Sequence, residues 1–498
     1  LDVTNIDSDI PDLQWFANCT HSGSYLCPGG SPSVTGKTIN SDLRMQWMWS
    51  AYDQGQYFVA VDSTATIESG VNTLPAADMT MTIPLQSTGG NFALLTSNSI
   101  TWSTANDPAF RYDLAFSSAS VPHHPVVGVV YAGRSAGARA LVLKADVDRS
   151  VPPTGQAVTA SSSMRLDTRD SQDFSLQALP ATRWVAVGGV AGNATYDLGF
   201  MVSDSDWTGS NPPPDVSVTL TSYGGTTNRA LWIDTSEPFT NSGQTYVGIG
   251  FVRVFTNPDT TTTSYVTVLK GNVDGTTLGS VLDDSDYDLA VNASGHAGSS
   301  AGIDRLRIRY AQQSGVGYFY LAYREGADIK VSKLRSEYSN TVGYDRSGPV
   351  SLAVSAMTTD TSNATAFDWQ SVDLALNTDT TPATPVVVYR DKNGVCWLQH
   401  VAPDLSSAAT AVALSTQDCR HPTVHYNAAA NVYVVTFAEQ VPGNTTYDIK
   451  TVEVTPGTND TVGTPSVVVA GLATFPAKLT TNLYPEGHWM AMVYRLNT

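Results

Sequence analysis

Eight short apolar strands recur along the 498 residues of the chain, and this repeat limits the possible folds more than any other feature. Each strand is rich in valine and aromatic residues and follows another short strand and a tight turn. Successive strands begin roughly 50 to 70 residues apart, which suits four-stranded β-units that carry long loops. The eight strands are predicted at residues 56–61, 125–131, 183–187, 246–251, 317–323, 385–389, 432–437 and 488–494.

A third strand follows most of these apolar strands, and its residues alternate between polar and apolar. Continuous apolar runs are typical of strands buried on both faces, whereas alternation is typical of strands with one wetter side. No segment shows a helical period with capping residues, so we expect an all-β protein. The third strands are predicted at residues 138–143, 196–200, 265–269, 328–332 and 447–452.

This pattern resembles the β-propeller class over most of the chain, although the motifs of individual propeller families do not accompany it. The sialidase Asp-box has only a loose echo at residues 203–207, and the WD dipeptide is absent. The resemblance implies a single closed β-propeller, with eight blades favoured and seven as the alternative if the first or last unit is not a blade. Two stacked β-sandwiches are the competing fold, but no linker-like change in composition occurs near the middle of the chain.

The last unit ends at Thr498 after two strands, and a sheet with an open edge is prone to aggregation. Strand-like pieces at residues 1–6 and 33–39 would complete that unit. We therefore expect residues 1–40 to form an N-terminal arm of closing strands with a local disulfide, and residues 41–498 to form the propeller.

The four cysteines lie in two close pairs, Cys19 with Cys27 and Cys396 with Cys419. An even number at short spacing favours two local disulfides made in an oxidising compartment, and neither pair has the spacing of a zinc site. The sequence begins at Leu1, which a cleaved signal peptide or a shortened chain explains equally well. No run of 18 or more apolar residues is present to span a membrane. We expect a secreted protein, extracellular or associated with a cell surface.

Charged residues make up only 14% of the chain, and the net charge is −18. This balance argues against nucleic acid and anionic membranes as partners, because both would repel the protein. Six Asn-x-Ser/Thr sequons fall in predicted turns or loops, and we expect N-glycosylation there. The six sequon asparagines are Asn18, Asn193, Asn292, Asn363, Asn444 and Asn459.

Arginines recur just after the apolar strands, often beside a tyrosine, at connections that open on a common ligand-binding face of propellers. Guanidinium groups bind carboxylates and sulfates through paired hydrogen bonds, and tyrosine rings stack on sugars, so a ring for anionic glycans is predicted. The alternative is that the arginines pair with acids such as Glu325 and Asp391 and brace the units. The ring would consist of Arg134, Arg253, Arg324, Arg390 and Arg495 with Tyr131, Tyr323, Tyr389 and Tyr494.

A different pattern places arginine at every other position of residues 304–310, on a predicted inner strand. Buried arginines need partners. We therefore expect Arg305, Arg307 and Arg309 to meet aspartates of an adjacent unit or to face the central axis, with bracing as their main role.

Residues with catalytic potential are sparse. His123 and His124 invite comparison with propeller polysaccharide lyases, but Arg134 would lie at the other end of a strand about 20 Å long, so a surface loop is the simpler interpretation. Glutamates are too few to indicate a glycosidase pair. No cofactor is expected, although a cluster of aspartates could hold calcium, the alternative being a solvated acidic loop. The cluster is Asp283, Asp284, Asp286 and Asp288.

These observations favour a non-catalytic secreted glycoprotein with a structural or adhesive role at an extracellular surface or filament, assembling through propeller faces. Its partners would be further copies of itself or other extracellular glycoproteins. The alternatives are a lectin-like propeller for anionic glycans and, third, a polysaccharide lyase or glycosidase, so whether the chain is an enzyme stays open.

Overall fold

Strands of the computed structural model are described between Ile39 and Leu496, and side chains chiefly at residues 232–252, 264–274, 305–326, 328–337, 371–428, 430–457 and 460–473. Every regular element in this part of the chain is a β-strand, so the protein is all-β, as predicted. The described residues contain no helix of the length and apolarity that crossing a membrane requires.

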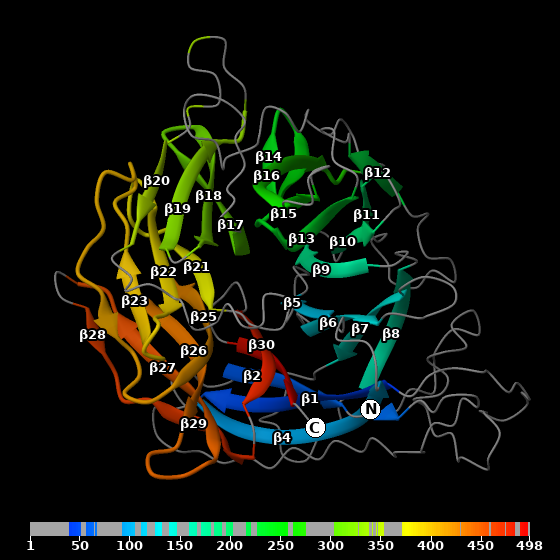
Figure 1. The fold of residues 1–498 in the computed structure, drawn as a ribbon, viewed down its shortest axis with the longest axis vertical. Coiled ribbons are helices and arrows are strands. Elements are labelled where there is room, and N and C mark those ends of the chain that lie inside the picture. Colours follow the sequence, from blue (N-terminus) through cyan, green and yellow to red (C-terminus); the bar gives the residue numbers. More distant parts are fainter. Residues whose placement is uncertain are drawn as a thin grey trace, which may run out of the picture.

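The described strands form seven mainly antiparallel sheets arranged around a central axis (Figure 1). Six of them are consecutive in sequence and have a first strand nearest the axis. Sheet 1 contains β5 (Arg111–Phe116), β6 (Pro125–Tyr131), β7 (Arg139–Asp146) and β8 (Thr159–Leu166). Sheet 2 contains β9 (Ser171–Ala178), β10 (Trp184–Ala191), β11 (Tyr196–Val202) and β12 (Val216–Leu220). Sheet 3 contains β13 (Thr227–Thr235), β14 (Phe239–Asn241), β15 (Gln244–Thr256) and β16 (Thr262–Asn272).

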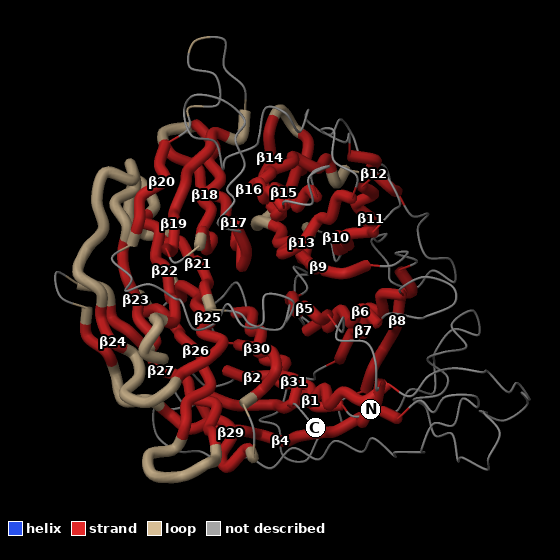
Figure 2. The backbone as a smooth tube through the Cα atoms, in the orientation of Figure 1, coloured by secondary structure: helices blue, strands red, loops and turns tan. Residues whose placement is uncertain are grey.

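The next three sheets continue this order (Figure 2). Sheet 4 contains β17 (Ile303–Gln313), β18 (Val316–Glu325), β19 (Asp328–Arg335) and β20 (Ser347–Ser351). Sheet 5 contains β21 (Val372–Asn377), β22 (Thr384–Arg390), β23 (Cys396–His400) and β24 (Val412–Ala413). Sheet 6 contains β25 (Cys419–Asn427), β26 (Val432–Gln440), β27 (Tyr447–Thr455), β28 (Thr461–Val462) and β29 (Ser466–Leu472).

Sheet 7 combines strands from both ends of the chain. It contains β30 (Pro476–Leu483) and β31 (Trp489–Leu496) together with β1 (Ile39–Ser50), β2 (Gln56–Ser63), β3 (Ala65–Thr66) and β4 (Phe92–Thr104). β31 pairs with β1 at Met45↔Val493 and with β2 at Tyr57↔Trp489. The first and last of the eight repeat units therefore share one sheet. Residues 1–40 were expected to supply the closing strands and one disulfide, and all of them except residues 39 and 40 lie outside the described residues.

The first strands of successive sheets contact one another from β5 through β9, β13, β17, β21 and β25 to β30, and β30 in turn contacts β5. This arrangement of antiparallel sheets around an axis is that of the β-propeller class. The hydrophobic core lies between neighbouring sheets rather than at the axis. In β18, Phe319 and Leu321 pack against sheet 3, whereas Tyr320 and Ala322 pack against sheet 5. Burial on both faces explains the continuous apolar runs and confirms that prediction.

A β-bulge recurs in the first strands of three sheets. The register shifts between Leu231 and Asp234, between Asp304 and Arg307, and between Arg420 and Thr423. In each case the first bulged residue has a positive φ, 56° at Trp232, 57° at Arg305 and 54° at His421. Bulges redirect the side chains that follow them. They place Asp234, Arg307 and Thr423 at equivalent positions of the repeat.

Candidate functional site

Polar side chains on or next to the first strands of sheets 3, 4 and 5 contact one another, and Arg309 is at their centre. This axial cluster consists of Asp234, Glu237, Arg307, Arg309 and Asp373. Arg309 Nη1 lies 2.9 Å from Asp234 Oδ2 in the preceding sheet, and its Nη2 lies 3.4 Å from Asp373 Oδ1 in the following sheet. Its Nε is 3.6 Å from Oε1 of the more exposed Glu237. Arg307 Nε also approaches Asp373 Oδ1, at 3.3 Å. Arginines of residues 304–310 thus meet aspartates of adjacent sheets, as predicted.

The electrostatic consequence is a permanently charged Arg309. Burial alone would lower the pKa of its guanidinium, but the carboxylates of Asp234, Asp373 and Glu237 outweigh that effect and raise the pKa above its ordinary value. Arg305 has a different environment, since its guanidinium lies 5.4 Å from the centre of the Trp232 ring in the neighbouring sheet. Both arrangements connect sheet 4 to sheet 3.

The two aspartates also hold the backbone of the next first strand. Asp234 Oδ2 accepts a hydrogen bond from the N–H of Ile308 at 2.9 Å, and Asp373 Oδ2 accepts one from Val424 at 2.9 Å. In sheet 2, Ser175 Oγ accepts a hydrogen bond from the N–H of Thr235 at 3.1 Å. A polar side chain of one sheet therefore anchors the inner strand of the next at three junctions. This chemistry aligns the sheets.

His425 continues the axial cluster towards sheet 7. Its Nε2 is 2.9 Å from Thr481 Oγ1, which in turn donates a hydrogen bond to Thr423 Oγ1 at 2.6 Å. Burial, together with the positive charge of Arg309, lowers the pKa of His425 to about 3. The imidazole is therefore neutral near pH 7 and serves as a hydrogen-bonding link between β25 and β30.

The tyrosines predicted to stack on sugars are buried where the structure describes them. Tyr323 and Tyr389 are each 1% exposed. Tyr323 OH is 3.2 Å from Ser332 Oγ, and Tyr389 OH donates to Gln399 Oε1 at 2.9 Å. Burial raises the pKa of Tyr323 to about 12. Both rings belong to the packing between sheets, which leaves their faces covered.

The predicted arginines that lie in described strands do not all occupy the same position of the repeat. In sheet 4, Arg324 pairs with Asp304, the last residue before the bulge. In sheet 3, Arg253 pairs with Ala230, which is one residue further from the bulge. In sheet 7, Arg495 pairs with Lys478, the first residue after the register shift. Arg324 and Arg390 share a position, and both are largely buried. Arg390 Nη2 lies 2.8 Å from Asp418 Oδ1, next to sheet 6, in agreement with the bracing alternative.

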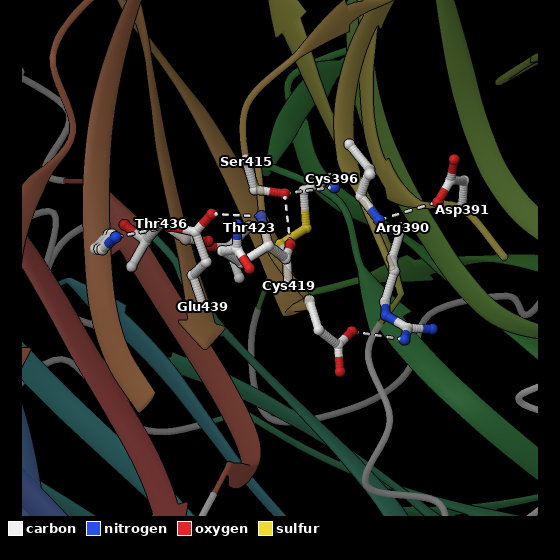
Figure 3. The surroundings of a disulfide bond; sticks show 12 residues. Arg390, Asp391, Cys396, Ser415, Cys419, Thr423, Thr436 and Glu439 are labelled. Carbon is white, nitrogen blue, oxygen red and sulfur yellow. Dashed lines mark hydrogen bonds and ion pairs between the residues drawn. A yellow bond between two sulfur atoms is a disulfide. The ribbon is translucent and has the colours of Figure 1, made fainter. Parts of the chain in front are cut away.

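The predicted disulfide between Cys396 and Cys419 is present and joins β23 to β25, that is, sheet 5 to sheet 6. Figure 3 shows the polar groups around it. Ser415 Oγ accepts the N–H of Cys396 at 2.9 Å. Glu439 Oε1 accepts the N–H groups of Thr416 and Gln417, and its Oε2 contacts Lys450 Nζ at 2.7 Å. The chain between the two cysteines is thus held at both ends.

Three further basic side chains were not identified from the sequence. Lys270, Lys333 and His400 lie near the ends of β16, β19 and β23, opposite Gly248, Tyr320 and Val386 at equivalent positions. Each reaches the connection after the third strand of the next sheet. The partners are Glu337 for Lys270, the carbonyl oxygen of Pro403 at 3.2 Å for Lys333, and Asp460 Oδ2 at 2.9 Å for His400. An alignment of the third strands in the sequence would have shown these three basic residues at equivalent positions.

Several predicted site residues cannot be placed beside this cluster. Arg253, Arg495, Tyr131 and Tyr494 lie in described strands whose side chains are not described there, and the rest lie outside the described residues. The rest are Arg134, His123, His124, Cys19, Cys27, Asn18, Asn193, Asn292, Asn363, Asn459, Asp283, Asp284, Asp286 and Asp288. Within the described ranges, acids, histidines and cysteines form no group of three able to hold a metal.

No protein-family model and no curated protein sequence matches the chain. Among solved structures, the chain is similar to a six-bladed, fucose-recognising lectin from Aleuria aurantia, with 12% identity, a TM-score of 0.36, and coverage of 73% of this chain and 96% of the lectin. An α-L-arabinofuranosidase from Fusarium graminearum gives 12% identity, a TM-score of 0.36, and coverage of 73% and 94%. A leech trans-sialidase gives 8% identity, a TM-score of 0.33, and coverage of 95% and 93%. These likenesses are distant, and no function follows from them.

Proposed function

We propose that the chain is a non-catalytic, secreted propeller of seven sheets, closed by strands from both chain ends, with a structural or adhesive role outside the cell. The observation that carries the proposal is the use of its buried charges. Arg309 links sheets 3, 4 and 5, and Lys270 and Lys333 each contact the following sheet. Charges held in this way stiffen a scaffold and are not poised for reaction.

An inter-sheet disulfide supports the same role. Cys396–Cys419 connects neighbouring sheets through a covalent bond that persists in oxidising surroundings. A rigid disc of this kind can present loops on its two faces for self-association or for contact with other extracellular glycoproteins. No cofactor is part of this proposal.

Electron microscopy of the protein as released by its native source tests this function. Ordered fibres or sheets repeating at propeller dimensions are the expected result. Single discs that stay monomeric in sedimentation at high protein concentration contradict it, because a structural protein of this kind must make large contacts with its own copies.

Binding of anionic glycans is the second candidate, favoured by the shared position of Arg324 and Arg390. A panel of carboxylated and sulfated polysaccharides tests it at low and high salt, since contacts between guanidinium groups and anions weaken with ionic strength. Retention that is lost in Arg324→Ala or Arg390→Ala supports this candidate. Equal retention by the variants removes these arginines from it, and assaying the same panel for cleavage products tests the enzymatic alternative.

A further inference from the structure

The turn between β26 and β27 presents a sequon to solvent. The Val441 N–H donates to Thr446 O at 2.9 Å, and the Asn444 N–H donates to Val441 O at 3.0 Å, which closes a tight loop. Residues 442–445 are exposed. Gln440 Nε2 donates to the backbone oxygen of Asn444 at 3.0 Å. Within the described part of the chain, the Asn444 side-chain amide makes no hydrogen bond, so its nitrogen faces water.

Position and sequence together single out this turn. Asn444-Thr445-Thr446 has the hydroxyl two residues after the asparagine that an acceptor site needs. The equivalent turns of sheets 4 and 5, at Gly326 and at residues 391–395, are also hairpin turns but contain no sequon. A positive φ of 74° at Gly443 allows the chain to reverse direction just before Asn444.

The turn lies on the disulfide side of the junction between sheets 5 and 6. The Gln440 N–H donates to Asp418 O at 2.9 Å, and Asp418 also pairs with Arg390. Asp418 directly precedes Cys419 of the disulfide. A glycan, which is bulky and strongly hydrated, would cover this edge of the molecule.

We propose that Asn444 carries an N-linked glycan, and that this glycan keeps the disulfide side of sheets 5 and 6 out of contacts with further copies of the chain. The donor is a lipid-diphosphate-linked oligosaccharide of the secretory pathway. The bond between sugar C1 and the phosphate oxygen breaks, a bond between C1 and Asn444 Nδ2 forms, and the proton released by the amide goes to the departing lipid diphosphate. The shielding part rests on the proposed structural role, whereas glycan attachment does not.

Peptide mapping of the protein secreted from eukaryotic cells tests the attachment. Trypsin cleavage after Arg420 and Lys450 isolates residues 421–450, in which Asn444 is the one sequon. Thr446→Ala destroys that sequon, and Thr445→Ala is the matched control because it removes a neighbouring hydroxyl and leaves the sequon intact. Wild type and Thr445→Ala are expected to give a glycosylated peptide that a glycan-releasing amidase converts to the aspartate form, and Thr446→Ala an unmodified peptide. An unmodified wild-type peptide overturns the proposal.

Sedimentation velocity of the same three proteins tests the shielding. Thr446→Ala is expected to associate further than wild type and Thr445→Ala at equal concentration. Equal sedimentation of all three overturns the shielding while the peptide map still reports attachment. Absence of native assemblies in electron microscopy contradicts the structural function and does not bear on the glycan, so the two failures are distinguishable.

Discussion

At the scale of single residues, Arg309 shows how a charge can serve the architecture. An arginine between two sheets costs desolvation energy that only close, well-oriented acids offset. Asp234 and Asp373 meet that requirement, and each also holds the backbone of a neighbouring strand. Removing the arginine therefore leaves two carboxylates in a largely water-free environment.

Replacing Arg309 with methionine is expected to lower the free energy of unfolding by about 3 to 5 kcal/mol, because a buried charge pair is broken from one side. Urea denaturation followed by tryptophan fluorescence measures it. Arg307→Met is the control, since Asp373 keeps its contact with Arg309 in that variant and the loss should be smaller. Equal losses in both variants would show that the central position of Arg309 has no special weight.

His425 predicts a pH dependence of stability. Its folded-state pKa of about 3 lies below the ordinary value, so between the two values the unfolded chain binds a proton that the folded chain does not. The contribution of His425 to the free energy of unfolding is complete above about pH 6.5 and is lost as the pH falls towards 3. The free energy of unfolding then changes by at most about 1.4 kcal/mol per pH unit through this residue. Unfolding curves across this range measure the slope.

His425→Gln is the control for this dependence. Glutamine retains a hydrogen-bonding group near Thr481 but does not titrate, so the slope should decrease in the variant. Burial also lowers the pKa of His400, which is unchanged in this variant, so part of the pH dependence of stability remains. A slope identical to that of the wild type would assign the acid sensitivity to other groups.

At the scale of elements, the disulfide connects two neighbouring sheets. Local pairing of Cys396 with Cys419 was expected from their spacing, but the strands that carry them, β23 and β25, belong to different sheets. The bond therefore fixes the position of sheet 6 relative to sheet 5, where Arg390 and Asp418 also meet.

A Cys396→Ala/Cys419→Ala double variant is expected to lose about 3 kcal/mol of stability, the loop-entropy value for two residues 23 positions apart. Guanidinium unfolding measures it, with reduced wild-type protein as the comparison. Reduction and substitution should give similar losses. A double variant as stable as the oxidised wild type would mean that the polar contacts around the bond hold the junction by themselves.

At the scale of the whole molecule, β1 and β2 carry the N-terminal part of the chain into the sheet that contains β31. Pairing of these distant chain segments in one sheet covers strand edges that each segment would otherwise expose. The stability of β1 should then depend on the stability of β31.

Native-state hydrogen exchange is expected to show common protection for the backbone amides of residues 42–45 and 493–496, because these residues pair with one another. Mass spectrometry of peptic fragments at increasing urea concentration measures it. Fast exchange at residues 42–45 combined with slow exchange at residues 493–496 would contradict closure by the N-terminal strands. The strands β22 and β26, far from this pairing, supply the internal reference.

The sequence by itself determined the strand content, the repeated apolar second strands and the Cys396–Cys419 bond. These depend on local properties: alternation of side chains, turn residues and short loop length. It also predicted that arginines of residues 304–310 pair with aspartates across sheets, since a buried charge needs a partner. Which aspartates they meet depends on the bulge that aligns neighbouring first strands.

Only the tertiary structure decided that the first and last repeat units share a sheet, because pairing between distant segments depends on how the sheets pack and not on either segment alone. It also decided the fate of Tyr323 and Tyr389, which neighbouring sheets cover completely. The same holds for Lys270, Lys333 and His400, whose equivalence appears only after the strands are in register. Local sequence sets which strands form, whereas packing between sheets sets which side chains remain available for function.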